Sequence, residues 1–184
     1  VCMKHVGLNV AADAFVNSAI TGVNGGLIVL VADDPSMHSS QNEQDSRFYG
    51  KFAMIPILEP SSQQEAYDMV RYGYELSEKL RLPLLMRVTT RMAHSRAVVK
   101  VLPVNEIAEQ NSMNDNARAA DFILLPANAR RRNNELVAQQ PELEKIAEES
   151  RFNKYINGNG KAERGIIACG IAWNYLNEYL ASDS

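Results

Sequence analysis

Cysteine, excess basic charge and long apolar runs are all scarce in this sequence, and each shortage excludes a class of protein. The two cysteines of the 184 residues, Cys2 and Cys169, stand near opposite ends without C-x-x-C spacing, which argues against a disulfide framework, a zinc knuckle or an internal iron–sulfur cluster. A net charge of −3 disfavours a nucleic-acid partner. The longest apolar run, 26–32, is far short of the ~20 residues that span a bilayer. We therefore expect a cytoplasmic protein that has neither a membrane segment nor a nucleic-acid ligand.

Familiar catalytic and nucleotide-binding motifs are missing as well. No G-x-x-x-x-G-K-[ST] loop occurs, and no G-x-G-x-x-G follows an apolar strand. Asp34, His38 and Ser39 leave a Ser-His-Asp hydrolase open as an alternative, although no G-x-S-x-G elbow supports it. The acidic residues around His38 match no metal-binding loop in their spacing, so we expect no metal site there.

Short apolar runs that alternate with helical or polar segments carry the prediction of the fold. Such runs are typical of strands that are covered on both faces, and they occupy 1–3, 27–32, 55–58, 84–89 and 121–125. A polar turn at 4–7 and a helical pattern from Leu8 to Ile20 separate the first two runs, as in a βαβ unit. The sequence therefore predicts an α/β fold, a doubly wound and mainly parallel sheet with helices on both faces.

Two further helical regions have recognisable start and stop residues. Ser62 and Glu65 form a capping-box pattern for a helix that runs to about Leu80. A second, charged helical region covers 128–150, and Pro141 is expected to split it into two helices.

The last third of the chain predicts a domain boundary. Residues 109–118 are rich in Asn and Gln, which favours a mobile loop. An Asn-Gly-Asn-Gly turn then places a linker at 153–164. We expect an α/β domain over 1–152, and after the linker a strand at 165–170 and a helix that together open the next domain, at 165–184.

Polar segments follow three of the predicted strands. Those at 4–7 and 33–47 leave the first two strands at the same edge of a parallel sheet, where α/β proteins bind ligands. Loops as long as 33–47 usually serve a function, and we expect this one to be ordered and to line a cleft. Arg91 and Arg96, after the strand at 84–89, either bind an anion or pair with surface carboxylates. Spacing and composition name no reaction.

Four segments, however, resemble one known family. They are KHVGLNVAAD at 4–13, ADDPSMHSSQNEQDSR at 32–47, TRMAHSR at 90–96 and PANARRR at 126–132. They resemble the alpha subunits of the indolepyruvate ferredoxin oxidoreductases, in the 2-oxoacid:ferredoxin oxidoreductase family. The resemblance covers essentially the whole chain, and it implies that the chain is most of a thiamine-diphosphate-binding pyrimidine domain.

The resemblance also implies an activity and its components. Enzymes of this family oxidatively decarboxylate aryl-2-oxoacids of the indolepyruvate and phenylpyruvate type to aryl-acetyl-CoA. Their cofactors are thiamine diphosphate with magnesium and iron–sulfur clusters, their substrates are an arylpyruvate and coenzyme A, and their partners are a beta subunit and ferredoxin.

Two sets of residues are expected at the site, from the resemblance and from their places at the strand ends. The cofactor-binding set is Lys4, His5, Gly7 and Asn9. The substrate-pocket set is His38, Ser39, Gln41, Asn42 and Arg47.

Three family features are missing, so we expect an inactive fragment. The family's glutamate that protonates the aminopyrimidine lies upstream of the strand that Val1 continues, and Glu43 is in the wrong place to replace it. The G-D-G motif that holds magnesium and the C-x-x-C-x-x-C repeats of the cluster domain are absent too. The catalytic residues stay unassigned, and neither tight cofactor binding nor turnover is expected of the chain alone. A non-catalytic α/β module that grips a protein partner is the alternative.

Overall fold

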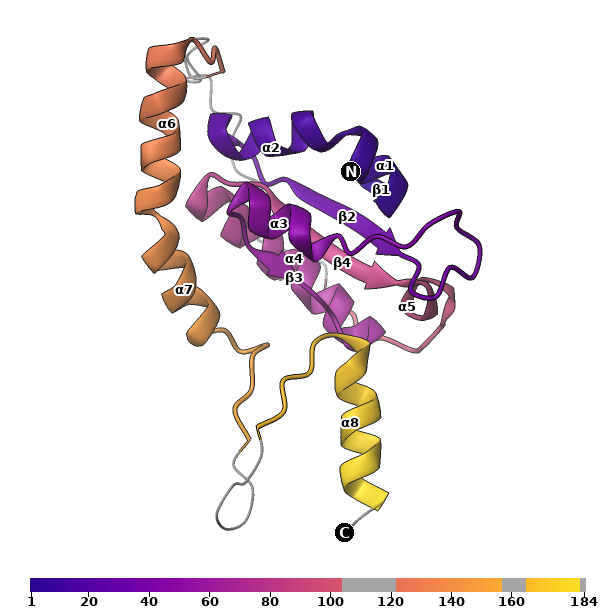
Figure 1. Cartoon of the computed structure of the whole chain (residues 1–184). Helices are drawn as coiled ribbons and strands as arrows, with labels where there is room; N and C mark the ends of the chain where they lie inside the picture. Colours follow the sequence, from indigo (N-terminus) through magenta and orange to yellow (C-terminus); the bar gives the residue numbers. More distant parts are fainter. Residues whose placement is uncertain (104–121, 157–164, 183–184) are drawn as a thin grey trace.

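A computed structural model describes residues 1–103, 122–156 and 165–182, and within these residues it contains one parallel sheet (Figure 1). The sheet has four strands in the order β1-β2-β4-β3. They are β1 (Cys2–Lys4), β2 (Ile28–Asp33), β3 (Ile57–Leu58) and β4 (Leu84–Thr89). All three neighbouring pairs are parallel. The predicted parallel α/β fold is confirmed.

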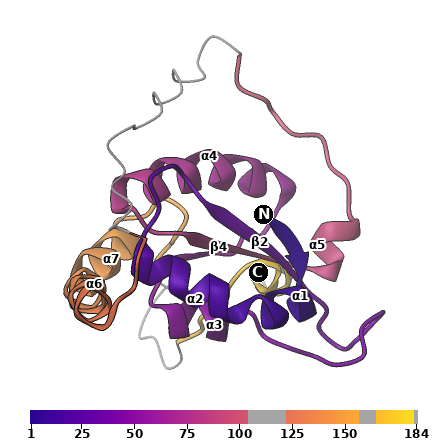
Figure 2. The ribbon, with the colours of Figure 1, turned by 90° about the horizontal axis from the view of Figure 1, so that it is seen from above.

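Helices cover both faces of the sheet. Two helices, α1 (His5–Val10) and α2 (Ala12–Thr21), connect β1 to β2, and α3 (Arg47–Ala53) precedes β3. On the other face, α4 (Gln63–Leu80) connects β3 to β4. Figure 2 shows α4 on one side of the strands and α1, α2 and α3 on the other. The sheet is therefore doubly wound.

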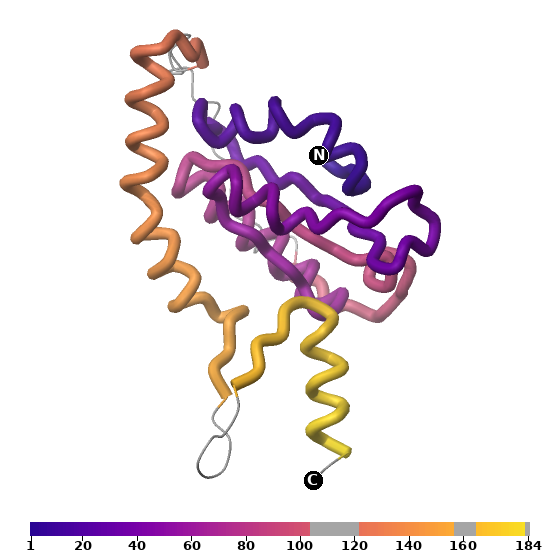
Figure 3. Tube along the Cα trace, in the orientation of Figure 1, coloured from indigo at the N-terminus to yellow at the C-terminus, as the bar shows by residue number. Residues whose placement is uncertain are grey.

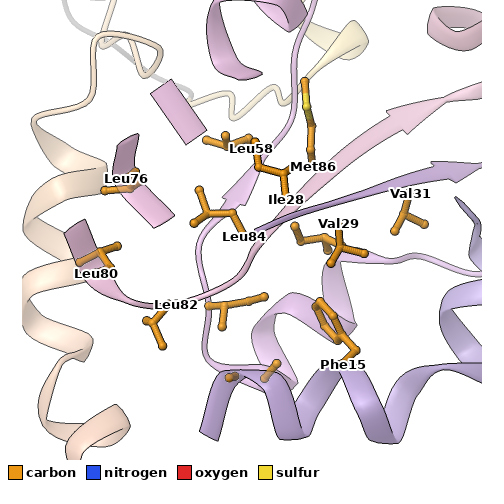
Figure 4. Packing of buried hydrophobic residues seen from close by; sticks show 14 of the residues in the cluster. Phe15, Ile28, Val29, Val31, Leu58, Leu76, Leu80, Leu82, Leu84 and Met86 are labelled. Atoms are coloured by element: carbon orange, nitrogen blue, oxygen red, sulfur yellow. The ribbon is translucent and has the colours of Figure 1, made fainter. Parts of the chain in front are cut away.

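The mostly apolar strands β2 and β4 form the centre of the core, because helices exclude water from both faces of the sheet. Val31, Leu84 and Leu85 are fully buried. Phe15 of α2 lies near Val29 on one face, and α4 contributes Leu76 and Leu80, as Figure 4 shows. The predicted strands at 27–32, 55–58 and 84–89 are confirmed to within about two residues.

Two helical segments lie beside this layer, where the strands begin (Figure 1). They are α6 (Pro126–Ala138) and α7 (Gln140–Glu148), and the break between them lies next to Pro141 as predicted. The start of α4 is also confirmed, because the Ser62 hydroxyl accepts a hydrogen bond from the Glu65 amide at 3.2 Å. The Glu65 carboxylate reaches back to the Ser61 amide, at 2.6 Å, one residue earlier than in a standard capping box.

Three expectations from the sequence are wrong. The polar turn at 4–7 does not form, because Lys4 ends β1 in an extended conformation and His5 begins α1 directly. Residues 122–125 contain no strand, and Pro126 starts a helix immediately after them. Residues 165–169 contain no strand either, and Ile167 is 94% exposed. A short apolar run is stabilised as a strand by backbone hydrogen bonds to a neighbouring strand, and without such a neighbour it has no reason to be extended.

The helix expected after the last of these runs is confirmed as α8 (Ile171–Ser182). The Asn- and Gln-rich segment 109–118 and the turn at 157–160 lie outside the described residues, so both stay predictions, as does the division into domains. No helix in the described parts of the chain is both long and apolar enough to cross a membrane.

Candidate functional site

Three chain segments meet at the edge where the strands end. The helix α1 follows β1, the β2–α3 loop (residues 34–46) follows β2, and α5 (Thr90–His94) follows β4. Figure 3 traces the β2–α3 loop and α5 side by side at this end of the sheet. Because β2 lies between β1 and β4, its loop contacts both neighbouring segments. This edge is the ligand-binding position of parallel α/β sheets.

The carboxylate of Asp34 fixes the first half of the loop. Its oxygens accept hydrogen bonds from the backbone amides of His38, at 3.2 Å, and Ser39, at 2.8 Å. The Thr90 hydroxyl donates a third, at 2.7 Å. The Thr90 hydroxyl, followed by the Ser39 amide and the Ser40 hydroxyl, holds the pKa of Asp34 far below its usual range, although desolvation by burial opposes this shift.

The neighbouring carboxylate, Asp33, fixes the end of the loop. It accepts hydrogen bonds from the Ser46 amide, at 3.0 Å, and the Ser46 hydroxyl, at 2.5 Å. Arg87 of β4 donates to the same carboxylate at 2.5 Å, and its other arm donates to Glu59 at 2.5 Å. The side chains of Asp33 and Arg87 are only 1% and 8% exposed. The loop therefore ends on a buried, charged network.

Two residues of the predicted cofactor-binding set hold the middle of the loop. His5 is fully buried, with its Nε2 3.1 Å from the Asn42 carbonyl oxygen and its Nδ1 3.4 Å from that of Ala32. Because a carbonyl oxygen can only accept a hydrogen bond, the shorter contact requires that His5 carries a proton on Nε2 and donates it to Asn42. Lys4 Nζ donates to the Ser40 hydroxyl at 2.8 Å.

The other two residues of that set, Gly7 and Asn9, contact β1 and α3 instead of the loop. A Cβ on Gly7 would lie 3.1 Å from the Cβ of Met3, so α1 approaches β1 closely at this point. The Asn9 side-chain oxygen accepts a hydrogen bond from the Tyr49 hydroxyl of α3. Lys4 and His5 thus contact the loop and Asn9 contacts the helix that follows it, whereas Gly7 lies against β1.

All of the predicted substrate-pocket residues lie on the exposed side of this edge. They are His38, Ser39, Gln41, Asn42 and Arg47. The guanidinium of Arg47, at the start of α3, donates to both carboxylate oxygens of Asp45, and the closest approach is 2.6 Å. This contact raises the pKa of Arg47 and lowers that of Asp45. The Arg47 side chain is 46% exposed, so a permanent positive charge remains accessible to an anion.

Arg91 contacts a tyrosine of α8, and its binding of an anion stays a prediction. The guanidinium donates to the Tyr175 hydroxyl of α8 and lies over the Tyr175 ring, 5.2 Å from the centroid. The start of α8 is attached to the same edge, because Asn174 donates to the Ser61 carbonyl at 2.6 Å. The Ser-His-Asp alternative also gains no support, since the Asp34 carboxylate holds backbone amides instead of an imidazole.

Sequence reasoning did not assign Asp33, Asp34, Arg87 and Thr90 to the site as anchoring residues. Two consecutive carboxylates at the end of a buried strand were one sign of anchoring residues, because a buried carboxylate requires hydrogen-bond donors. Their partners on β4 and α5 could not be found, since they lie more than 50 residues away in the sequence.

The residues of this edge fit one end of thiamine diphosphate. An aminopyrimidine ring requires both donors and acceptors, which the exposed amides of Gln41 and Asn42 can supply. Within the described residues, the Gln44 side-chain oxygen and the Thr89 hydroxyl are buried without a hydrogen-bond partner at this same edge. The described segments contain no group of three or more His, Cys, Asp or Glu side chains that could hold a metal ion.

Comparison with known proteins gives close relatives. The chain is 47% identical over 181 residues to the indolepyruvate oxidoreductase subunit IorA of Methanothermobacter thermautotrophicus, an alignment that covers 98% of this chain and 29% of that protein. It is 46% identical over 185 residues to the subunit of the same name from Thermococcus kodakarensis, and 48% over 186 residues to that of Pyrococcus horikoshii. These two alignments cover 97% of this chain and 28% of each relative. No protein-family model and no solved structure matches.

Proposed function

Because this chain belongs to the family of the indolepyruvate oxidoreductase subunit IorA, we propose that it forms part of an oxidoreductase that acts on aryl-2-oxoacids. The enzyme converts indolepyruvate or phenylpyruvate to the aryl-acetyl-CoA and passes the electrons to ferredoxin. The chain spans less than a third of the relatives it matches. The clusters, the magnesium diphosphate site, and the contacts with coenzyme A, ferredoxin and the beta subunit are therefore assigned to other parts of a cytoplasmic enzyme.

In this proposal residues 1–152 form most of the pyrimidine-binding domain. Bound thiamine diphosphate supplies the nucleophilic carbon that decarboxylation of a 2-oxoacid requires. Lys4, His5, Gly7 and Asn9 form the cofactor wall. The buried His5 acts by holding the Asn42 carbonyl, while Gly7 lets α1 lie close to β1.

The observation that carries the proposal is an anchored loop with a half-exposed cation at its end. Arg47 binds the carboxylate of the 2-oxoacid, because a guanidinium can accommodate a second anion beside Asp45. His38, Ser39, Gln41 and Asn42 supply the remaining polar contacts of the substrate pocket. Water is excluded from beneath the loop by the buried residues Asp33, Asp34 and Ser46.

Alanine variants of the loop in the complete enzyme test this proposal. His38→Ala and Gln41→Ala should each lower arylpyruvate-dependent reduction of a viologen dye, or the affinity for thiamine diphosphate, by about tenfold or more, the usual effect of losing a hydrogen bond to a charged or reacting group. Asn134→Ala, an exposed amide on α6, is the matched control and should leave both unchanged. If both loop variants behave like the control, the assignment of the site is wrong.

The chain alone should be inactive. In this proposal the glutamate that protonates the aminopyrimidine and the anchor of the diphosphate belong to other parts of the enzyme, and losing a positioned proton-transfer group alone lowers a rate by about 10²–10⁴-fold. Titration calorimetry of thiamine diphosphate into the chain should show no micromolar binding, and dye reduction should stay at background. A clear dye signal from the chain alone contradicts this expectation.

One observation favours the second function, a protein-interaction module. Phe48 and Phe52 lie one turn apart on α3 and are 71% and 72% exposed, an arrangement that suits a protein partner. Recovery of such a partner by the complete subunit, together with no effect of thiamine diphosphate on that subunit, would favour this function over catalysis.

A further inference from the structure

Two consecutive carboxylates at the end of β2 hold opposite ends of the β2–α3 loop. Successive side chains of a strand point to opposite sides, so Asp33 and Asp34 reach different neighbours. Asp34 holds the amides of His38 and Ser39, whereas Asp33 holds Ser46. The loop is thereby fixed at its start and at its end.

The two carboxylates differ in what surrounds them. Asp33 is paired with Arg87 in a buried ion pair that also joins Glu59, so it ties the sheet together. Asp34 is held instead by four uncharged donors, three of which belong to the loop and one to α5. Asp34 thus connects the predicted substrate residues to the end of β4.

We propose that Asp34 is a positioning residue, which acts on the reaction by fixing the backbone of His38 and Ser39 against Thr90. This inference rests on the proposed function, because it assigns Asp34 a role in binding the aryl-2-oxoacid without contact to it. Asp34 does not touch the reacting atoms, which other groups contact. The consequence is a specific sensitivity of substrate affinity to the charge at residue 34.

The chemistry of the contacts requires a carboxylate and not an amide. All of these partners donate to Asp34, so both of its oxygens must accept. An asparagine would turn its NH₂ group toward one of these donors, and that contact would be lost. The lowered pKa of Asp34 keeps the carboxylate ionised throughout the neutral range, which suits this role.

The experiment compares Asp34→Asn with the unmodified complete enzyme, assembled with its partner subunit. We expect the KM for the arylpyruvate to rise about tenfold or more, as for a lost charge-assisted hydrogen bond. The kcat and the KM for coenzyme A should change less than about threefold, because the reacting groups stay in place. Amide hydrogen exchange of the peptide over 36–42 should accelerate. Asp13→Asn, an exposed aspartate on α2, is the control and should change none of these quantities.

A pair of variants at residue 90 separates positioning from folding. Thr90→Ser retains the hydroxyl and should retain the substrate KM, whereas Thr90→Val removes it and should raise the KM in the same direction as Asp34→Asn. Unchanged exchange of the loop in Asp34→Asn would refute the anchoring role. Faster exchange with an unchanged KM would refute the positioning role. If the unmodified enzyme shows no arylpyruvate turnover, the proposed function fails, and the exchange measurement still decides whether Asp34 anchors the loop.

Discussion

Replacement of Arg87 by methionine tests the buried ion pair below the site. Arg87 lies on the central strand β4 and donates to Asp33 and Glu59 at 2.5 Å each. The side chains of Asp33 and Glu59 are 1% and 14% exposed. Methionine fills a similar volume but leaves both carboxylates without this cation in a site that water scarcely reaches.

The size of the effect follows from burial. An exposed ion pair is worth about 0–1 kcal/mol, whereas removing one partner of a buried pair costs about 3–5 kcal/mol because a charge is left without compensation. A domain is stable by about 5–15 kcal/mol in total. Arg87→Met should therefore remove a large fraction of the free energy of unfolding.

Urea denaturation of the chain, followed by far-UV circular dichroism, measures this loss. Arg71→Met is the matched control, because Arg71 pairs with Glu75 on the exposed side of α4 with side chains 42% and 63% exposed. It should cost less than about 0.5 kcal/mol. A loss below about 1 kcal/mol for Arg87→Met would show that the network behaves like a solvated surface pair, and the reasoning would be refuted.

Two further predictions concern a turn and a carboxylate. Gly22→Ala should destabilise the chain by about 1–2 kcal/mol, because Gly22 has φ +73° and an added Cβ would lie 2.9 Å from the Arg81 carbonyl oxygen. Gly25→Ala has nothing within 4 Å of the added Cβ and should be close to neutral in the same urea denaturation; equal losses would contradict the prediction. The lowered pKa of Asp34 contributes stability that is present above its ordinary value of 3.8 and is lost as the pH falls toward the folded-state value. The unmodified chain should therefore lose more stability than Asp34→Asn between about pH 5 and 2, and parallel curves would argue against the assigned hydrogen bonds.

The sequence predicted the elements whose cause is local or periodic. Residues 28–32 and 84–86 are apolar without interruption, and such runs are strands when both faces are covered. Ser62 starts α4 as its pattern indicated. The run at 122–125 has the composition of a strand, yet it forms none, and a helix begins directly after it at Pro126. Apolar composition therefore did not suffice to predict a strand where no neighbouring strand pairs with the run.

The candidate site could be located from the sequence but not constructed from it. Lys4, His5 and the β2–α3 loop follow adjacent strands, and the topology of parallel sheets brings such segments together. The contact between Arg87 and Asp33 joins residues 54 positions apart, and nothing in either local sequence specifies it. Long-range polar contacts of this kind depend on the register of β2 against β4, which a single sequence does not determine.

Because every ladder in the sheet is parallel, none of its strand pairs can begin as a tight hairpin. The backbone hydrogen bonds within α4 join residues close in the sequence, whereas the hydrogen bond from Thr90 to Asp34 closes a loop of 56 residues. Closing such loops costs chain entropy before any contact compensates for it. We therefore expect the edge at which the strands end to be completed late in folding, after β2 and β4 have met. Until then the apolar side chains of both central strands lack the neighbours that cover them, which favours aggregation.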